Sequence, residues 1–163
     1  MDDRYLADWT GTRYGTPSGL ERPQSTAAVS ALLQASTARR KAIAVQGGRT
    51  GVSGGAAPGD GELVLSLERL NQVETFDRDA GVIIVGAGAL LEDVQRLVEG
   101  EGWCFPLDLA SRGSCQIGGN VATNAGGSRV LKYGSMRSLV LGLEAVLADG
   151  TVLGPPNQLV KNN

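Results

Sequence analysis

The stretch AVQGGRTGVSGGA (residues 44–56) joins a short apolar run to a dense group of glycines. A glycine has no Cβ and tolerates positive φ, so successive backbone N–H groups in such a loop can turn inward and bind an anion. Arg49 adds charged hydrogen-bond donors, and Thr50 adds a hydroxyl. The pattern favours a diphosphate cradle at the end of a strand, although an ordinary glycine-rich turn can have the same composition.

The composition of the whole chain limits its partners. Its 163 residues fit one domain or two small lobes that share a cleft, and 42% of them are hydrophobic, which is enough for a core. The net charge of −2 argues against nucleic acid or an anionic membrane as the main partner. No apolar run reaches the roughly 18 residues of a membrane span, and Cys104 and Cys115 are too few for a metal site. We therefore expect no transmembrane segment, no bound metal and a cytoplasmic location.

The absence of histidine restricts the chemistry further. Without histidine the chain has no imidazole general base, no histidine metal ligand and no histidine for covalent cofactor attachment. We therefore predict no catalytic residue in this sequence. Any reaction must depend on a bound cofactor or on residues outside these 163.

The hydrophobic periodicity predicts alternating helices and strands, which is an α+β pattern. Residues 1–22 read as an irregular N-terminal segment with one short helix at residues 4–9. Longer helices are expected at residues 26–40, capped by Ser25, and at residues 90–99, ended by Gly100. Strands are expected at residues 43–46, 62–67, 71–77, 81–85 and 103–105, followed by a hairpin-like pair at residues 140–147 and 151–153. The polar end after this pair predicts a fragment of a longer protein.

A second group of glycines lies in PLDLASRGSCQIGGNVATNAGGSRVLKY (residues 106–133). Small hydroxyl and amide side chains between the glycines offer hydrogen bonds with little bulk, which suits a flat heteroaromatic ligand lying against backbone. Tight loops across a small core use the same residue types. Although the two groups lie about 60 residues apart, one site that holds both the diphosphate and the ring of a ligand explains both.

Together the two stretches resemble the FAD-binding domain of the vanillyl-alcohol-oxidase (PCMH-type) flavoproteins. The resemblance runs from about Arg22 to the end and is nearest to the branch of the glycolate oxidase FAD subunit, D-lactate dehydrogenase and D-2-hydroxyglutarate dehydrogenase. It implies that residues 23–163 form an incomplete FAD-binding domain after the N-terminal segment. Its two small α/β lobes, at about 23–85 and 86–163, would hold FAD in the cleft between them. The C-terminal substrate domain of that branch is absent from this sequence.

The resemblance also assigns cofactor-binding residues. The pyrophosphate loop is matched by Gln46, Gly47, Gly48, Arg49, Thr50, Gly51 and Ser53. The segment around the ribityl-diphosphate region is matched by Pro106, Leu107, Asp108, Gly113, Ser114 and Cys115. The stretch near the flavin ring is matched by Gly118, Gly119, Asn120, Thr123, Asn124, Gly126 and Gly127. Arg49 stands where related proteins vary in residue type. Because many members attach flavin through histidine, its absence here implies non-covalent FAD.

The activity implied by the resemblance is oxidation of a small D-2-hydroxyacid, such as glycolate, D-lactate or D-2-hydroxyglutarate, to the 2-oxoacid. Hydride would pass to flavin N5, and the electrons would then pass to a partner acceptor. The 163 residues alone are not expected to be active. Two alternatives remain open: a nucleotide-binding module without redox activity, and another flavoenzyme of the same superfamily with a different alcohol substrate.

Overall fold

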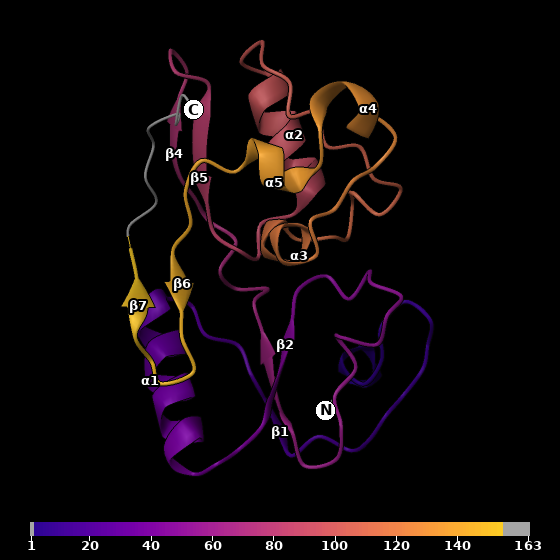
Figure 1. Cartoon of the computed structure of the whole chain (residues 1–163), viewed down its shortest axis with the longest axis vertical. Coiled ribbons are helices and arrows are strands. Elements are labelled where there is room, and N and C mark those ends of the chain that lie inside the picture. The colour runs from indigo at the N-terminus through magenta and orange to yellow at the C-terminus, as the bar shows by residue number, and fades with distance from the viewer. Residues whose placement is uncertain (1, 155–163) are drawn as a thin grey trace.

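The computed structural model describes residues 2–154, which form two lobes stacked along the long axis of the molecule (Figure 1). The lower lobe contains the N-terminal segment, β1 (Gly19–Glu21), α1 (Thr26–Ala38), β2 (Ile43–Gln46) and β3 (Leu63–Ser66). The upper lobe contains β4 (Val73–Asp77), β5 (Val82–Val85), α2 (Leu91–Glu99), α3 (Ile117–Ala122), α4 (Val130–Tyr133) and α5 (Met136–Leu139).

The lower lobe is built on a parallel sheet of three strands in the order β1-β3-β2. Gly19 of β1 and Ile43 of β2 both lie opposite Leu63 of the central strand. Val64 and Leu65 in that strand are buried, as expected for a strand with neighbours on both sides. Residues 47–62 connect β2 to β3 without a helix, so the glycine-rich loop itself forms this parallel crossover.

Helix α1 begins where its sequence predicts. The Ser25 hydroxyl accepts a hydrogen bond from the Ala28 N–H at 3.2 Å, which satisfies a free donor of the first turn. The helix ends at Ala38, two residues earlier than expected, because Arg40 adopts a left-handed φ of 51° that a helix cannot continue.

The upper lobe has its own core, to which α2 and α3 both contribute. The β4–β5 hairpin is antiparallel, and Ile83 and Val85 of β5 pack against this core. Helix α2 carries Glu92 and Asp93 in its first turn, where carboxylates interact favourably with the helix dipole. The buried cluster consists of Ala89, Leu91, Val94, Leu107, Cys115, Ile117 and Met136.

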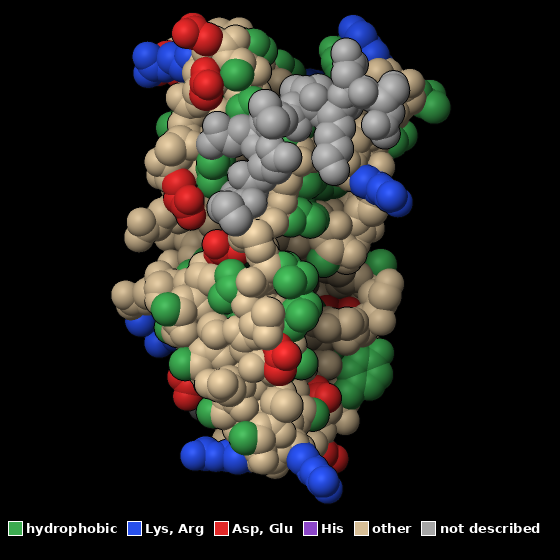
Figure 2. Space-filling view, turned by 60° about the vertical axis from the view of Figure 1, so that its left-hand side comes forward, with side chains coloured by type: hydrophobic (Ala, Val, Ile, Leu, Met, Phe, Trp, Pro, Cys, Tyr) green, Lys and Arg blue, Asp and Glu red, His purple; other side chains and the backbone are tan. Residues whose placement is uncertain are grey.

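After the upper lobe, the chain returns to the lower lobe as the short antiparallel pair β6 (Ala145–Val146) and β7 (Val152–Leu153). This pair lies beside α1, where the Ser30 and Thr37 hydroxyls donate to the carbonyls of Gly150 and Ala148. Figure 2 turns this side toward the viewer and shows hydrophobic side chains near its middle. The exposed hydrophobic side chains of this part of the chain are Leu143, Leu147, Val152 and Leu153.

Several local predictions are wrong, each for a physical reason. The expected helix at residues 4–9 is only a 3₁₀ turn, Asp3–Tyr5, and β1 lies in a segment expected to be irregular. Residues 103–105 are not a strand, because the Trp103 N–H donates to the Val98 carbonyl and the chain turns tightly after α2. Helices α3, α4 and α5 were not expected, and the strand expected at residues 140–147 is only Ala145–Val146. The polar residues 155–163 lie outside the described residues, and the domain and lobe boundaries stay a prediction.

Candidate cofactor-binding site

The two glycine-rich stretches meet where the lobes join. We call residues 44–56 the first glycine zone and residues 106–133 the second glycine zone. A Cβ added to Gly48 would lie 2.0 Å from the Ser114 carbonyl oxygen. A Cβ added to Gly47 would lie 3.8 Å from the Cα of Gly119. The two stretches therefore form one continuous backbone surface, and Gly48 permits the close approach because it has no side chain.

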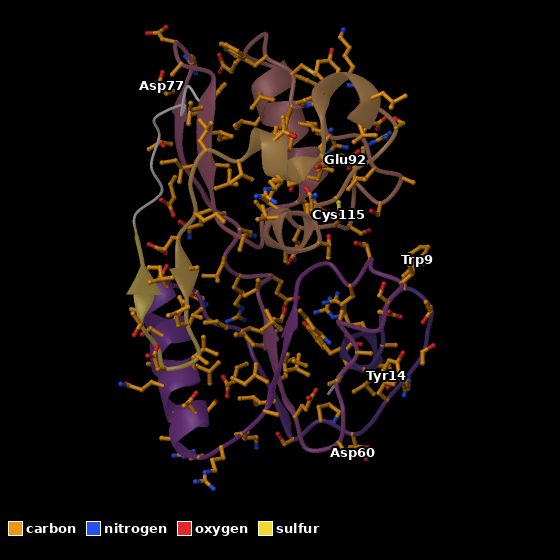
Figure 3. The ribbon with its side chains drawn as sticks, viewed as in Figure 1. Trp9, Tyr14, Asp60, Asp77, Glu92 and Cys115 are labelled. Carbon is orange, nitrogen blue, oxygen red and sulfur yellow. The ribbon has the colours of Figure 1, made fainter. Side chains whose placement is uncertain are left out.

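A cavity of about 450 Å³ opens at this junction, next to the carboxyl end of β2. Ligands of open sheets with parallel strands commonly bind beyond this end of the strands. Figure 3 shows Trp9 and Cys115 at the level of the junction, Trp9 in the lower lobe and Cys115 in the upper. The walls come from four segments of the chain. They include Arg4, Asp8 and Trp9, then Gly48, Arg49 and Thr50, then Leu90, and then Ser114 and Gln116.

Gln46 fixes the start of the first glycine zone. Its fully buried side-chain Nε2 donates to the carbonyls of Tyr5, at 2.8 Å, and Ala56, at 2.6 Å. These bonds join the end of β2 to the N-terminal segment and to the far end of the zone. Between these points Gly51 and Gly55 face open space, where an added Cβ would meet no atom within 4 Å. The zone is thus anchored at both ends and has free space beside Gly51 and Gly55.

Arg49 contributes a positive charge to the cavity. Its φ is 56°, its guanidinium lies 5.0 Å from the centre of the Tyr5 ring, and its Nη1 donates to the Gly47 carbonyl at 3.3 Å. The ion pairs formed by residues 2–154 do not include Arg49. A guanidinium without a carboxylate partner can bind a phosphate oxygen, so this loop suits an anion.

Asp8 holds the second half of the first glycine zone. Its Oδ2 accepts from the Gly54 N–H at 2.9 Å. Hydrogen bonds from the Thr10 hydroxyl, the Thr10 N–H and the Gly54 N–H hold the pKa of the Asp8 carboxyl below its usual value. Asp8 is therefore a charged anchor for the loop at neutral pH.

Gln116 adds a polar side chain to the wall of the cavity. The side chain lines the cavity at 7% exposure, and its Oε1 has no hydrogen-bond partner in the part of the chain that the structure describes. A buried polar atom without a partner is destabilising. Ribose and ribityl hydroxyls donate hydrogen bonds, so a flavin nucleotide could supply a donor to Gln116 Oε1 and a phosphate to Arg49.

The structure brings only part of the predicted site to this junction. Gly47, Gly48, Arg49, Thr50, Ser114 and Gly119 lie at or beside the cavity, with Gln46 directly below. Gly51 accepts a hydrogen bond from the Trp9 N–H at the edge of the loop, and Ser53 is exposed. Leu107, Cys115 and Asn120 are buried within the upper lobe.

The remaining predicted residues bind other parts of the upper lobe. Asp108 lies 3.6 Å from Arg112 and accepts from the Ser128 hydroxyl. Thr123 donates to the Gly119 carbonyl, and Asn124 accepts from the Arg137 N–H. Pro106 is half-buried. The glycines among these residues lie beside protein atoms at the position of an added Cβ: Gly113 beside Glu92, Gly118 beside Ala87, Gly126 beside Val130 and Gly127 beside Asp108.

Sequence reasoning missed the N-terminal wall of the cavity and Gln116. Arg4, Asp8 and Trp9 carry no motif, and only the folding of residues 2–11 against the first glycine zone reveals them. Gln116 had a usable signal, because it is an amide between Cys115 and the Gly118-Gly119 pair.

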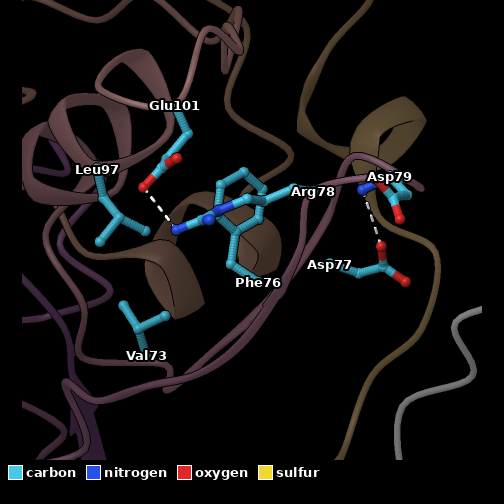
Figure 4. A pocket seen from close by; sticks show the side chains of 7 residues that line it. All are labelled: Val73, Phe76, Asp77, Arg78, Asp79, Leu97 and Glu101. Atoms are coloured by element: carbon cyan, nitrogen blue, oxygen red, sulfur yellow. Dashed lines mark hydrogen bonds and ion pairs between the residues drawn. The ribbon is translucent and has the colours of Figure 1, made fainter.

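A second cavity, of about 490 Å³, lies between the tip of the β4–β5 hairpin and the end of α2 (Figure 4), and no residue of either glycine zone lines it. Its Arg78 guanidinium is paired with Glu101 at 2.7 Å, which leaves no unpaired cation for an anionic ligand. Residues 2–154 contain no group of three His, Cys, Asp or Glu placed to hold a metal ion. They also contain no helix both long and apolar enough to cross a bilayer.

Comparison with known proteins identifies the family of the chain. A family model described as an FAD binding domain matches residues 17–154. A mitochondrial D-2-hydroxyglutarate dehydrogenase from Bos taurus is 49% identical over 156 residues, covering 96% of this chain and 29% of the relative. A D-2-hydroxyglutarate dehydrogenase from Xanthomonas citri is 45% identical over 161 residues, covering 99% and 34%. The chain thus spans about three tenths of the length of these relatives.

Among solved structures, 6-hydroxy-D-nicotine oxidase from Arthrobacter nicotinovorans matches with a TM-score of 0.80 at 24% identity. The match covers 93% of this chain and 32% of that chain, and it confirms the predicted fold class. The expected cytoplasmic location is wrong: the bovine relative and several others are named as mitochondrial proteins. Composition and the lack of an apolar span carried no information on this point. By its match to this family model over residues 17–154, the chain belongs to the FAD binding domain family, as its similarity to the D-2-hydroxyglutarate dehydrogenases also indicates.

Proposed function

We propose that this chain is the FAD-binding portion of a dehydrogenase that oxidises a small D-2-hydroxyacid to the 2-oxoacid. The observation that carries the proposal is the meeting of the two glycine zones around a cavity lined by Arg49 and by Gln116, whose Oε1 has no hydrogen-bond partner among residues 2–154. The names of the bovine and Xanthomonas relatives support D-2-hydroxyglutarate as the substrate to test first.

The first glycine zone would hold the diphosphate of FAD. Its open backbone at Gly51 and Gly55 and the charge of Arg49 supply donors for phosphate oxygens. Ser114 and Gln116 would bind hydroxyls of the nucleotide or the ribityl chain. When bound, FAD would supply the hydride acceptor, and the protein would orient it and exclude water.

We infer that FAD binds without a covalent bond. The chain has no histidine. Cys115 is only 2% exposed, and its sulfur lies 3.6 Å from the Asn120 side-chain amide. Cys104 is exposed but does not line the cavity. Acid precipitation should therefore release the flavin into solution.

The full reaction needs parts that this sequence does not contain. A C-terminal substrate domain would bind the hydroxyacid carboxylate and supply the base that takes the hydroxyl proton. A separate electron acceptor would then reoxidise the flavin. Glycolate and D-lactate are the next substrates to test, and nucleic acid is not proposed as a partner.

The proposal is tested on the natural full-length protein. Its visible absorption spectrum should show bound flavin, and D-2-hydroxyglutarate, D-lactate or glycolate should bleach that absorption under anaerobic conditions. The L-enantiomers of the first two serve as matched controls. A protein that binds FAD but is not bleached by any of the hydroxyacids contradicts the activity. A protein that cannot be reconstituted with FAD contradicts the site itself.

A further inference from the structure

The N-terminal segment, residues 2–11, holds the first glycine zone at three points. The Tyr5 carbonyl accepts from Gln46 Nε2 at 2.8 Å, the Trp9 N–H donates to the Gly51 carbonyl at 3.2 Å, and Asp8 accepts from the Gly54 N–H at 2.9 Å. The family match begins at residue 17, after this segment. The contacts therefore assign a role at the site to residues that lie outside both the glycine motifs and the family model.

Tyr5 is the centre of this segment. Its side chain is 1% exposed, and its hydroxyl donates to Glu68 Oε1 at 2.8 Å while accepting from Arg4 Nη2 at 2.6 Å. The guanidiniums of Arg4 and Arg49 lie 4.7 Å and 5.0 Å from the centre of its ring. A buried aromatic ring attracts a guanidinium placed at this distance, so Tyr5 holds Arg49 by its ring and is itself held by its hydroxyl.

Glu68 gives Arg4 a carboxylate partner that Arg49 lacks among residues 2–154. Burial raises the pKa of the Glu68 carboxyl, but hydrogen bonds from Tyr5 and Arg22 outweigh burial and lower that pKa overall. The charged carboxylate lies 3.7 Å from Arg4 and 3.2 Å from Arg22. Arg4 thus has a carboxylate partner, whereas the contacts of Arg49 among residues 2–154 are a carbonyl oxygen and the Tyr5 ring. Arg49 keeps its charge for a ligand in the cavity.

We propose that Tyr5 is a positioning residue for the phosphate groups of the cofactor. Its ring holds the Arg49 guanidinium at the wall of the cavity, so Arg49 loses little side-chain freedom when a pyrophosphate-bearing nucleotide binds. The left-handed backbone of Arg49 directs this side chain from a loop that otherwise offers only small groups. The identity of the nucleotide as FAD depends on the proposed function, but the pairing of Tyr5 with an anion-binding arginine does not.

A double-mutant cycle in the full-length protein tests this role. The variants are Tyr5→Leu, Arg49→Gln and both together, with Tyr5→Phe to keep the ring and Tyr133→Leu as a control tyrosine in α4. Affinities for FAD, ADP and riboflavin are measured by titration, and folding is monitored by thermal unfolding. We expect Tyr5→Leu and Arg49→Gln each to weaken FAD and ADP binding about tenfold. The double variant should bind no more weakly than Arg49→Gln alone.

Riboflavin and the conservative variants separate positioning from folding. Riboflavin carries no phosphate, so its affinity should not change, and Tyr5→Phe and Tyr133→Leu should bind FAD within about twofold of the wild type. If Tyr5→Leu does not fold, Tyr5→Met takes its place in the cycle, because the flexible methionine side chain adapts to the space without an aromatic face.

The outcomes distinguish this inference from the proposed function. Losses that multiply in the double variant, or an equal loss of riboflavin binding, overturn the positioning role while FAD binding by the wild type stands. Non-additive losses for ADP, in a protein that no hydroxyacid reduces, support the positioning role and overturn the dehydrogenase. A wild type that binds neither FAD nor ADP overturns both.

Discussion

In the first glycine zone Gly51 and Gly55 face open space, whereas in the second zone Gly118 and Gly127 lie against other parts of the upper lobe. A Cβ on Gly118 would lie 2.7 Å from the Ala87 Cβ, and one on Gly127 would lie 2.1 Å from the Asp108 carbonyl oxygen. Gly51 and Gly55 leave space for a ligand, whereas Gly118 and Gly127 allow the small upper lobe to pack. Glycines in two glycine-rich stretches thus have different physical roles.

Where the zones meet, the packed glycine belongs to the first zone and the open glycine to the second. Gly48 of the first zone packs against the Ser114 backbone, while Gly119 of the second zone has no atom within 4 Å of an added Cβ. Glycine content alone therefore cannot separate ligand-binding positions from packing positions. Substituting one glycine at a time can separate them, because each role predicts a different response of stability and FAD affinity.

The largest effect is expected for Gly48→Ala. The new methyl would collide with the Ser114 carbonyl at 2.0 Å and with the Cys115 Cα at 2.9 Å, and both are backbone atoms that cannot rotate away. We expect the free energy of unfolding to fall by about 3 kcal/mol. Chemical denaturation of the full-length protein measures this change, and FAD binding should be lost with it.

Gly51→Ala is the matched control for Gly48→Ala, because an added Cβ there meets no atom within 4 Å. Its free energy of unfolding should stay within about 0.5 kcal/mol of the wild type. Equal stability of the two variants would show that the zones do not approach each other as closely as described.

Gly119→Ala should separate stability from binding. Ala favours a helix over Gly by about 1 kcal/mol, and α3 has open space for the methyl, so the free energy of unfolding should rise by about that amount. The same methyl stands beside the cavity, and we expect FAD affinity to fall about tenfold. Thermal unfolding and FAD titration on one preparation measure both changes. A parallel loss of stability and affinity would instead make Gly119 a packing residue.

The sequence predicted the elements whose apolar pattern is bounded by clear stop signals. Strand β2 matches its predicted residues 43–46, since an apolar run there ends at glycines. Strand β1 was missed because Gly19-Leu20-Glu21 has one apolar residue, and its conformation depends on pairing with β3. Helix α3 was missed because Gly118 and Gly119 disfavour a helix. Its first turn is held instead by tertiary hydrogen bonds: the Ile117 N–H donates to the Ala89 carbonyl, and the Gly118 N–H donates to the Ala87 carbonyl.

The site was predictable to a similar degree. The glycine zones indicated the backbone surfaces that meet at the cavity, because lack of side chains is visible in sequence. The N-terminal wall was not predictable, because Tyr5 and Asp8 act through contacts with residues more than 40 positions away. Such contacts leave no local pattern.

Gln116→Leu should weaken binding without harming the fold. Leucine fills a similar volume and removes a buried oxygen that has no partner among residues 2–154, so the free energy of unfolding should be unchanged or slightly higher. The hydrogen bond proposed to the cofactor would be lost, which costs about 1 kcal/mol of binding free energy. Titration with FAD and chemical denaturation measure the two effects.

Gln95→Leu is the matched control for Gln116→Leu, because the Gln95 amide has hydrogen-bond partners within the protein. Gln95 Nε2 donates to the carbonyls of Leu107 and Phe105, at 2.7 Å and 3.3 Å, inside the upper lobe. Its loss should lower the free energy of unfolding by about 1 kcal/mol, with little direct effect on FAD. If Gln116→Leu is the less stable of the two, the Gln116 amide serves the fold and not a ligand.

The smallest expected effect is a change in how the free energy of unfolding depends on pH under acid conditions. Hydrogen bonds from the Thr10 hydroxyl, the Thr10 N–H and the Gly54 N–H lower the pKa of Asp8 in the folded protein. The stabilisation is therefore present above the unfolded-state pKa of about 3.9 and is lost as pH falls through the lower folded-state pKa. Asp8→Asn should be less stable than the wild type at pH 7, and the difference should shrink toward pH 3. Unfolding measured across this range tests the trend.

Asp149→Asn tests whether the Asp8 anchor matters to the site. The pKa of Asp149 is also lowered, by the N–H and hydroxyl of Thr151, but Asp149 lies at the turn between β6 and β7, which contributes nothing to the cavity wall. Both variants should lose stability with the same dependence on pH, because the same linkage applies to each carboxyl. Only Asp8→Asn should also weaken FAD binding, since Asp8 alone holds the Gly54 N–H in the first glycine zone. Equal FAD affinity in the two variants would mean that the loop keeps its shape without this anchor.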